Sequence, residues 1–227
     1  MFIVLEGLDG AGKSTQLQNV NDYLASQKIK SKFVHFPRFD TPVWGELIAK
    51  FLRGDLGEIN TVDPYIVAML FAGDRYDASS QINSWIMEGY CVLADRYVYS
   101  NIAYQCAKIS DEISREALQK WILHTEYDYF KIPKPDLTLF LDVPFRHVEQ
   151  KLKEVRSGND RSYLKGKEDI HESSLILQQQ VREIYRSQEK FDKHFITIDC
   201  GDDNVILPAD KIFEKIKSHI QPLIHNL

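Results

Sequence analysis

The chain has 227 residues, a size that suits one domain with a single large core. Its hydrophobic content of 44% and charged content of 27% are typical of a soluble globular protein. No apolar run approaches the ~18 residues that a membrane span requires, and the expected N-terminal strand has no signal-peptide pattern, so we expect a cytoplasmic protein without a membrane partner. The net charge of −5 argues against nucleic-acid binding, which favours a basic surface.

The three cysteines, Cys91, Cys106 and Cys200, are odd in number and form no C-x-x-C pair. This pattern predicts reduced, structural thiols. The seven histidines are scattered and show no zinc-ligand spacing.

Short apolar runs alternate with amphipathic stretches along the whole chain. The apolar runs predict strands at 2–6, 32–36, 91–94, 137–142 and 195–199. The amphipathic stretches predict helices at 13–26, 42–53, 64–87, 98–107, 114–126, 144–155, 168–190 and 208–224. The strands lack strict alternation, as is typical of parallel strands that are buried on both faces. The chain is therefore predicted to adopt an α/β fold, a three-layer doubly wound parallel sheet of about five strands.

The first predicted strand leads into Gly7-Leu8-Asp9-Gly10-Ala11-Gly12-Lys13-Ser14, which matches the G-x-x-x-x-G-K-[ST] phosphate loop. The glycines allow backbone N–H groups to curl around a phosphate chain, and the helix N-terminus behind them favours anions. In this motif Lys13 reaches the β- and γ-phosphates and Ser14 ligates Mg²⁺. We therefore predict an ATP site, with Lys13 at the mouth of the loop and outside the core.

Two charged residues that are candidates for the same site follow the third predicted strand. Asp95 stands where the acidic Mg²⁺ partner of a phosphate loop usually lies, often acting through water. Arg96 beside it suits bidentate contact with a phosphate, because its guanidinium is planar and forked. The alternative is a structural Asp–Arg pair that caps the next helix.

Two further segments carry candidate binding residues. Phe71 and Arg75 are four residues apart in a predicted helix and share a face. Together they are suited to bind a nucleobase, Phe71 by stacking and Arg75 by hydrogen bonding. Periodicity alone favours a core Phe and a surface Arg. Arg38 follows the second predicted strand and is a candidate for contact with a second anionic substrate.

The segment 156–167 lies between two predicted helices, contains several charged side chains and includes two glycines. It predicts a mobile lid within the single domain, with Arg156 and Arg161 as its cations. The alternative is a solvated basic loop.

Together these segments resemble the thymidylate kinase family. The family pattern F-E-G-x-D-G-x-G-K-[ST]-T is seen at residues 5–15, from Leu5 to Thr15, and D-R-Y-x-x-S-x-x-A-[FY] is matched from Asp95 to Tyr104. The family stretch P-D-L-T-L-x-L-D-V-P stands at residues 135–144. The resemblance covers roughly residues 2–199. It implies a Mg²⁺-dependent homodimeric enzyme that transfers the γ-phosphoryl group of ATP to dTMP, giving dTDP for dTTP synthesis.

The resemblance also implies how the base of dTMP is bound. Phe71 would stack on thymine and Arg75 would donate a hydrogen bond to its O4. Asn101 would face the edge of the base, and Gln105 would lie nearby.

For the sugar and phosphate of dTMP, the resemblance implies a second set of contacts. Tyr104 would pack under the deoxyribose, where a 2′-hydroxyl would clash, and Asp9 would meet the 3′-hydroxyl. Arg38 and Arg96 would hold the phosphate. Some relatives carry Tyr at the position of Phe39, so a hydroxyl contact of that residue is missing here.

Some members of the family carry an arginine in the phosphate loop at the position of Gly10. This chain resembles the subtype that has glycine there and takes its cations from the lid, here Arg156 and Arg161. With Lys13 and Arg96 they form the expected catalytic set, which neutralises the transferring phosphoryl group.

Two other functions are compatible with a phosphate loop. A deoxynucleoside kinase would need a carboxylate base near a 5′-hydroxyl and has less use for two arginines at an acceptor phosphate. A phosphate-loop switch or partner-regulated ATPase would not require the acceptor-site set Arg38, Phe71, Arg75 and Asn101.

Overall fold

The computed structural model describes residues 1–59, 61–153, 159–167, 169–171 and 174–224, without the side chains of 153 and 159–161. Five strands form one parallel sheet in the order β2-β3-β1-β4-β5. Their bounds are Phe2–Glu6 for β1, Ser31–His35 for β2, Cys91–Asp95 for β3, Leu137–Asp142 for β4 and Phe195–Asp199 for β5. The predicted fold class is confirmed, and each predicted strand is present with its bounds shifted by at most one residue.

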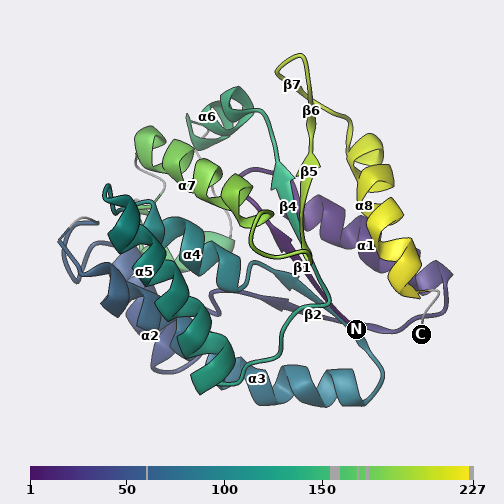
Figure 1. The fold of residues 1–227 in the computed structure, drawn as a ribbon, viewed down its shortest axis with the longest axis horizontal. Coiled ribbons are helices and arrows are strands. Elements are labelled where there is room, and N and C mark those ends of the chain that lie inside the picture. The colour runs from purple at the N-terminus through teal and green to yellow at the C-terminus, as the bar shows by residue number, and fades with distance from the viewer. Residues whose placement is uncertain (60, 154–158, 168, 172–173, 225–227) are drawn as a thin grey trace.

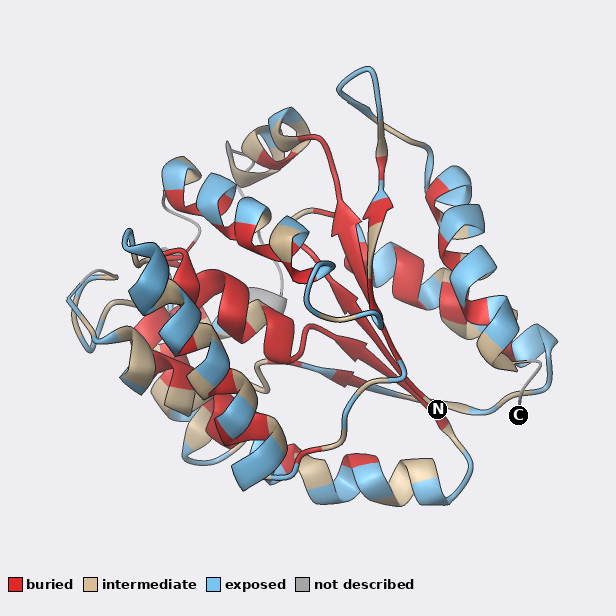
Figure 2. Ribbon diagram, in the orientation of Figure 1, coloured by how far each residue is buried: buried red, intermediate tan, exposed pale blue. Residues whose placement is uncertain are grey.

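Helices cover both faces of this sheet (Figure 1). One face carries α1 (Lys13–Ser26) and α8 (Ala209–Ile224), and the other carries α3 (Pro64–Met87), α4 (Val98–Cys106) and α7 (Leu175–Gln188). Every residue of β1, β3 and β4 is buried, as Figure 2 shows, because helices lie over both sides of these strands. Because β1 and β3 are parallel neighbours, their carboxyl ends lie at the same edge of the sheet, where α/β folds bind ligands.

The remaining helices surround α3 and α4. Helix α5 (Glu112–Leu123) packs on α4 and continues as a π-helical turn, η1 (His124–Tyr129), and α6 (Phe145–Lys153) follows β4. Helix α2 (Trp44–Leu52) packs closely on α3 because Gly73 leaves room for the Trp44 ring. A Cβ at Gly73 would lie 2.6 Å from atoms of that ring.

The structure corrects the predicted helix at 168–190. Helix α7 begins only at Leu175, because the Ser174 side chain accepts a hydrogen bond from the Leu177 N–H and caps it. Before it, the Asp169 carboxylate accepts from the His171 N–H, and the Ile170 N–H donates to Leu52 O. Residues 169–171 are therefore bound to the end of α2 and do not form the first turn of α7.

One small element was not predicted. Strands β6 (Gly201–Asp202) and β7 (Val205–Ile206) form an antiparallel hairpin after β5. Asp203 and Asn204 in its turn have φ of 46° and 63°, which Asp and Asn tolerate better than most residues.

Within the described parts of the chain, none of the helices combines the length and apolar character needed to cross a membrane.

We expect Cys91, Cys106 and Cys200 to be unreactive in the native protein. All three are buried and free, and burial raises the pKa of each thiol to about 12, so almost no thiolate is present near neutral pH. A chromogenic disulfide reagent at pH 8 should titrate no thiol before denaturant is added and all of them afterwards. Rapid release of chromophore from the folded protein would contradict this expectation.

Candidate active site

The phosphate loop joins β1 to α1, as predicted. Gly12 precedes the first turn of α1 with φ of 83°, a left-handed conformation that favours glycine. The Lys13 ammonium points back into the loop and donates to Gly7 O at 3.3 Å and Leu8 O at 3.2 Å. Lys13 is only 7% exposed, so the expectation that it lies outside the core is wrong. The side chain is buried because the loop wraps around it.

Asp95 lies across from this lysine at the end of β3. Its Oδ1 is 3.9 Å from Lys13 Nζ, and its Oδ2 is 3.4 Å from His35 Nδ1. Burial alone would raise the pKa of Asp95, but Lys13 and His35 more than offset it and lower the pKa below its ordinary value. The carboxylate is thus held in its ionised form, which is the form that binds cations.

Asp95 and Ser14 fit a Mg²⁺ site. Asp95 Oδ1 is a buried oxygen that has no hydrogen-bond partner among the described residues, although buried carboxylate oxygens normally have one. Ser14 presents an exposed hydroxyl in the first turn of α1 and lines the same cavity. Hydroxyl and carboxylate oxygens are the donors that Mg²⁺ prefers.

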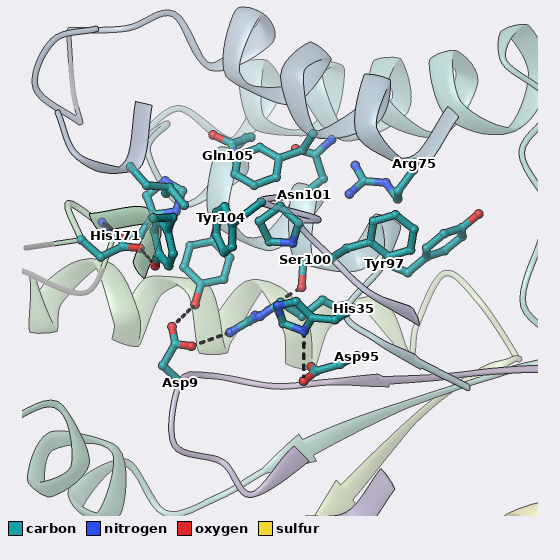
Figure 3. Close-up of a pocket in the computed structure, with 18 of the residues that line it drawn as sticks. Asp9, His35, Arg75, Asp95, Tyr97, Ser100, Asn101, Tyr104, Gln105 and His171 are labelled. Atoms are coloured by element: carbon teal, nitrogen blue, oxygen red, sulfur yellow. Dashed lines mark hydrogen bonds and ion pairs between the residues drawn. The ribbon is translucent and has the colours of Figure 1, made fainter. Parts of the chain in front are cut away.

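Arg96 contacts two other predicted site residues, Asp9 and Tyr104, which are labelled in Figure 3. Its Nη2 donates to Asp9 Oδ1 at 2.9 Å, and its guanidinium carbon lies 5.5 Å from the centre of the Tyr104 ring. The Tyr104 hydroxyl donates to the other Asp9 oxygen at 3.2 Å. The structure therefore brings Asp9, Arg96 and Tyr104 together, although they come from two different segments.

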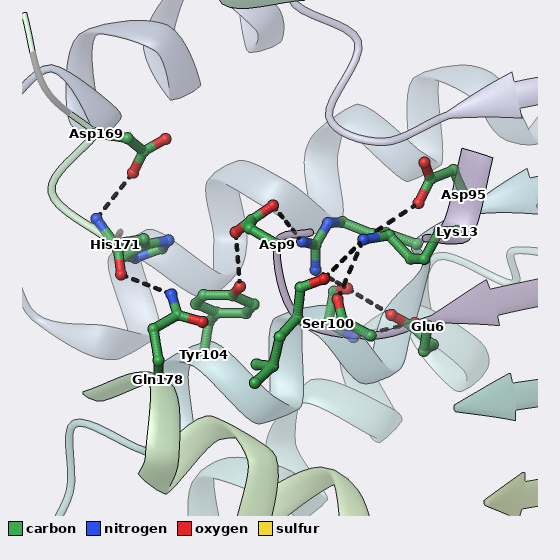
Figure 4. Close-up of polar contacts among 12 residues, drawn as sticks. Glu6, Asp9, Lys13, Asp95, Ser100, Tyr104, Asp169, His171 and Gln178 are labelled. Atoms are coloured by element: carbon green, nitrogen blue, oxygen red, sulfur yellow. Dashed lines mark hydrogen bonds and ion pairs between the residues drawn. The ribbon is translucent and has the colours of Figure 1, made fainter. Parts of the chain in front are cut away.

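A buried carboxylate that the sequence analysis did not single out supports this group (Figure 4). Glu6 accepts hydrogen bonds from the backbone N–H groups of Tyr97 and Ser100, and from the Tyr185 hydroxyl at 3.0 Å. Burial raises the pKa of Glu6 above its ordinary value, and these hydrogen bonds and Arg96 oppose the rise. Glu6 thus fixes the start of α4 beside the phosphate loop. Its position as the only charged residue of an otherwise apolar strand is the signal that could have found it.

A cavity of about 390 Å³ lies above the ends of β1, β2 and β3 (Figure 3). Among the predicted site residues, the cavity lining includes Asp9, Ser14, Phe71, Arg75, Asp95, Arg96, Asn101, Tyr104 and Gln105. A cavity of this size with convergent polar groups is typical of a small-molecule site.

At one end of the cavity the expectations from helix periodicity are reversed. Phe71 is half-buried in the cavity wall, whereas Arg75 is 2% exposed and buried. Arg75 forms a two-point ion pair with Glu126 of η1, through Nε at 2.5 Å and Nη2 at 2.7 Å. Burial would lower the pKa of Arg75, but the charge and hydrogen bonds of Glu126 raise it above its ordinary value. Gln105, also buried here, accepts from the Lys108 ammonium at 2.7 Å.

Arg38 is not among the residues that line this cavity. Its Nε donates to Asp74 Oδ1 at 2.8 Å and its Nη2 to Asp77 Oδ2 at 2.6 Å, so it is bound to α3. The expected contact of Arg38 with an acceptor phosphate therefore stays a prediction.

The segment after α6 covers the other end of the cavity. A 3₁₀ helix, η2 (Asn159–Leu164), brings the Tyr163 ring onto Phe39, with centroids 3.7 Å apart and planes 8° apart. His171 stacks on Tyr104 with centroids 4.9 Å apart, and both Tyr163 and His171 line the cavity. Within the predicted lid, Tyr163 therefore packs on the site and Leu164 is buried, whereas Ser162 and residues 165–167 are exposed. The lid stays a prediction.

The two lid arginines cannot be placed in this way. Arg156 lies outside the described residues. Arg161 belongs to η2, but its side chain is also outside the described part.

Comparison with known proteins matches this arrangement to one family. The family model described as "Thymidylate kinase" matches residues 5–206, which includes the phosphate loop, the cavity and the covering segment. The chain belongs to the thymidylate kinase family.

Individual relatives agree with this assignment. The thymidylate kinase of Dictyostelium discoideum is 30% identical over 181 residues, or 78% of this chain and 73% of the relative. That of Plasmodium falciparum is 30% identical over 151 residues, which span 66% of this chain and 65% of the relative. The solved thymidylate kinase of Candida albicans superposes with a TM-score of 0.72 at 28% identity, over 97% of this chain and 91% of that one.

Proposed function

We propose that the cavity binds dTMP beside the phosphate loop and transfers to it the γ-phosphoryl group of ATP, giving ADP and dTDP. As a member of the thymidylate kinase family the chain is a dTMP kinase. The observation that carries the assignment of this site is the shared cavity, which is lined by Asp9 and Ser14 of the phosphate loop, by Arg96 and Tyr104, and by Phe71 and Arg75.

The phosphate loop supplies the donor side of the site. We assign the ATP phosphates to the backbone N–H groups of residues 7–15, with Lys13 turning from the loop carbonyls to the β- and γ-phosphates. The Ser14 hydroxyl and, partly through water, the Asp95 carboxylate would hold Mg²⁺. When bound, Mg²⁺ supplies charge neutralisation and orientation of the phosphates.

Arg96 supplies a positively charged guanidinium at the point where the γ-phosphate of ATP and the phosphate of dTMP would meet. Phosphoryl transfer needs alignment and charge neutralisation more than covalent help. The acceptor is a phosphate monoester with a second pKa near ~6, so at neutral pH it is largely ionised and needs no general base. Arg156 and Arg161 stay predicted as further cations from the lid, as in the subtype with Gly10 in the loop.

The base and sugar contacts implied by the family fit the cavity. Phe71 offers a ring face for thymine, and Arg75 and Asn101 offer polar atoms for its edge with Gln105 nearby. Tyr104 is held by its hydrogen bond to Asp9 at the place where a deoxyribose would join base and phosphate, so its ring bulk would exclude a 2′-hydroxyl.

An acceptor screen tests the proposed function. With Mg·ATP, we expect dTMP to be the best acceptor and thymidine to be essentially inert, because Arg96 and Arg38 need a phosphate to bind. A coupled assay of ADP release with dTMP, with thymidine and without acceptor separates the three candidate activities. Turnover of thymidine at or above the rate for dTMP would favour a nucleoside kinase, and ADP release that does not depend on an acceptor would favour an ATPase.

We also propose that the chain acts as a homodimer. Helix α3 exposes large apolar side chains, Ile66, Tyr76 and Met87, which a partner chain would cover. Sedimentation equilibrium would measure the assembly. The cytoplasmic location and the single domain with a lid at 156–167 stay predictions from the sequence.

A further inference from the structure

A buried carboxylate lies behind the base end of the cavity. Glu126 belongs to the π-helical turn η1 and is fully buried. One side chain serves two cavity residues: Glu126 pairs with the Arg75 guanidinium, and its Oε1 also accepts from Asn101 Nδ2 at 3.0 Å. Such π-helical turns are frequent at functional sites.

The contacts of Asn101 fix which way its amide faces. Asn101 Nδ2 has two neighbours, Glu126 Oε1 and Ala68 O at 2.9 Å, and both are oxygens that only accept hydrogen bonds. The nitrogen must therefore be the atom on that side, because the amide oxygen would face two acceptors. Asn101 Oδ1 consequently lies on the other side of the amide.

That oxygen is left without a partner. Asn101 is 2% exposed, and its Oδ1 is a buried atom with no hydrogen bond in the described part of the protein. Asn101 lines the cavity, as Figure 3 shows. A buried acceptor of this kind normally has a donor, so the donor is expected from the ligand.

Among the described residues, Arg75 has a free donor where Asn101 has a free acceptor. Its Nε and Nη2 are used by Glu126, and Nη1 has no hydrogen bond within the described chain. Arg75 also lines the cavity. The wall thus presents one positive donor, from Arg75, and one acceptor, from Asn101.

We propose that Glu126 is a positioning residue that makes the site specific for thymine-like pyrimidines, by fixing Arg75 as a donor and Asn101 as an acceptor. This inference rests on the proposed function. Thymine carries an acceptor, O4, next to a donor, N3–H, whereas cytosine carries a donor, the N4 amino group, next to an acceptor, N3. Thymine pairs with the pattern that Glu126 fixes, and cytosine places donor against donor and acceptor against acceptor.

Glu126→Gln tests the proposal because it changes this pattern with almost no change of shape. The amide that the substitution introduces can place a donor toward Asn101, so one of the two acceptors that hold the Asn101 nitrogen is lost and only Ala68 O remains. Arg75 also loses its counter-charge. We expect the ratio of the dCMP inhibition constant to the dTMP KM to fall at least about tenfold, because sites with fixed polar partners discriminate strongly and this variant loses one contact that fixes Asn101 and the charge that fixes Arg75. The KM for ATP should stay unchanged.

Glu126→Asp is the second variant. It keeps the negative charge beside buried Arg75, so it folds even where Glu126→Gln does not, because loss of one partner of a buried ion pair is strongly destabilising. Its shorter side chain no longer reaches both Arg75 and Asn101, so we expect a smaller change of the same ratio in the same direction.

Asp128→Asn is the matched control. Asp128 is an exposed carboxylate of the same π-helical turn, and its removal should leave the ratio at the wild-type value. If Glu126→Asp, or a folded Glu126→Gln, keeps the wild-type ratio while dTMP is a substrate, the positioning role is wrong. If the wild-type protein does not phosphorylate dTMP, the proposed function itself fails.

Discussion

Lys13→Met is expected to lower kcat for dTMP phosphorylation about 10²–10³-fold, the loss seen when one donor to transition-state charge is removed. The lysine is the cation that the phosphate loop itself places at the bound phosphates. In the structure its ammonium is 3.9 Å from Asp95 Oδ1 and within reach of two loop carbonyls, so it is already in the loop before a nucleotide binds. Steady-state kinetics with Mg·ATP and saturating dTMP measure the effect.

Methionine is chosen because Lys13 is buried. Alanine would leave a gap under the loop in addition to the missing charge, and its loss of activity would be mixed with a loss of stability. Burial lowers the pKa of Lys13, which shows that its charge is held at a free-energy penalty, so replacement by an apolar chain of similar length is expected to be well tolerated. The exposed Lys211 of α8 is the control, since Lys211→Met should keep the wild-type rate and melting temperature. A Lys13→Met protein that turns over like wild type would remove the lysine from the mechanism.

Features whose causes are local in sequence were predictable. The strands are apolar runs without alternation, so their burial follows from the chain itself, and the phosphate loop carries its glycines with it. Asp95 and Arg96 were found because they stand at the carboxyl end of a strand that was expected to lie beside that loop. The start of α7 was missed although Ser174 is a local N-cap signal, whereas the contact of Ile170 with α2 joins distant segments and no local pattern reports it.

The supporting carboxylates were harder to find for the same reason. Glu126 lies 51 residues from Arg75 in the chain, so the helix periodicity that placed Arg75 on the surface could not take its buried partner into account. Arg38 shows the opposite case, since its pairing with Asp74 and Asp77 could not be read from its own loop. Buried ion pairs depend on which helices meet, and that is decided only by the whole fold.

Arg96 combines an unusual backbone conformation with a side chain that enters the site. Its φ is 67°, a left-handed conformation that costs a residue with a Cβ about 1–2 kcal/mol. The backbone is held there because the Arg96 N–H donates to Leu5 O at 2.9 Å, and the side chain then reaches Asp9 and lies against Tyr104. The strain is thus the means by which the guanidinium enters the site.

Arg96→Lys is therefore expected to lose about 10²–10³ in kcat and to raise the KM for dTMP, while the KM for ATP stays near wild type. Lysine has the same backbone strain and the same charge beside Asp9, so the melting temperature should shift by no more than about 4 °C. What it lacks is the planar fork that contacts two phosphate oxygens at once. Arg186→Lys is the matched control, because that arginine pairs with Asp142 away from the cavity and should give wild-type kinetics. A wild-type kcat in Arg96→Lys would show that charge alone suffices at this position, and the two-point phosphate contact would have to be abandoned.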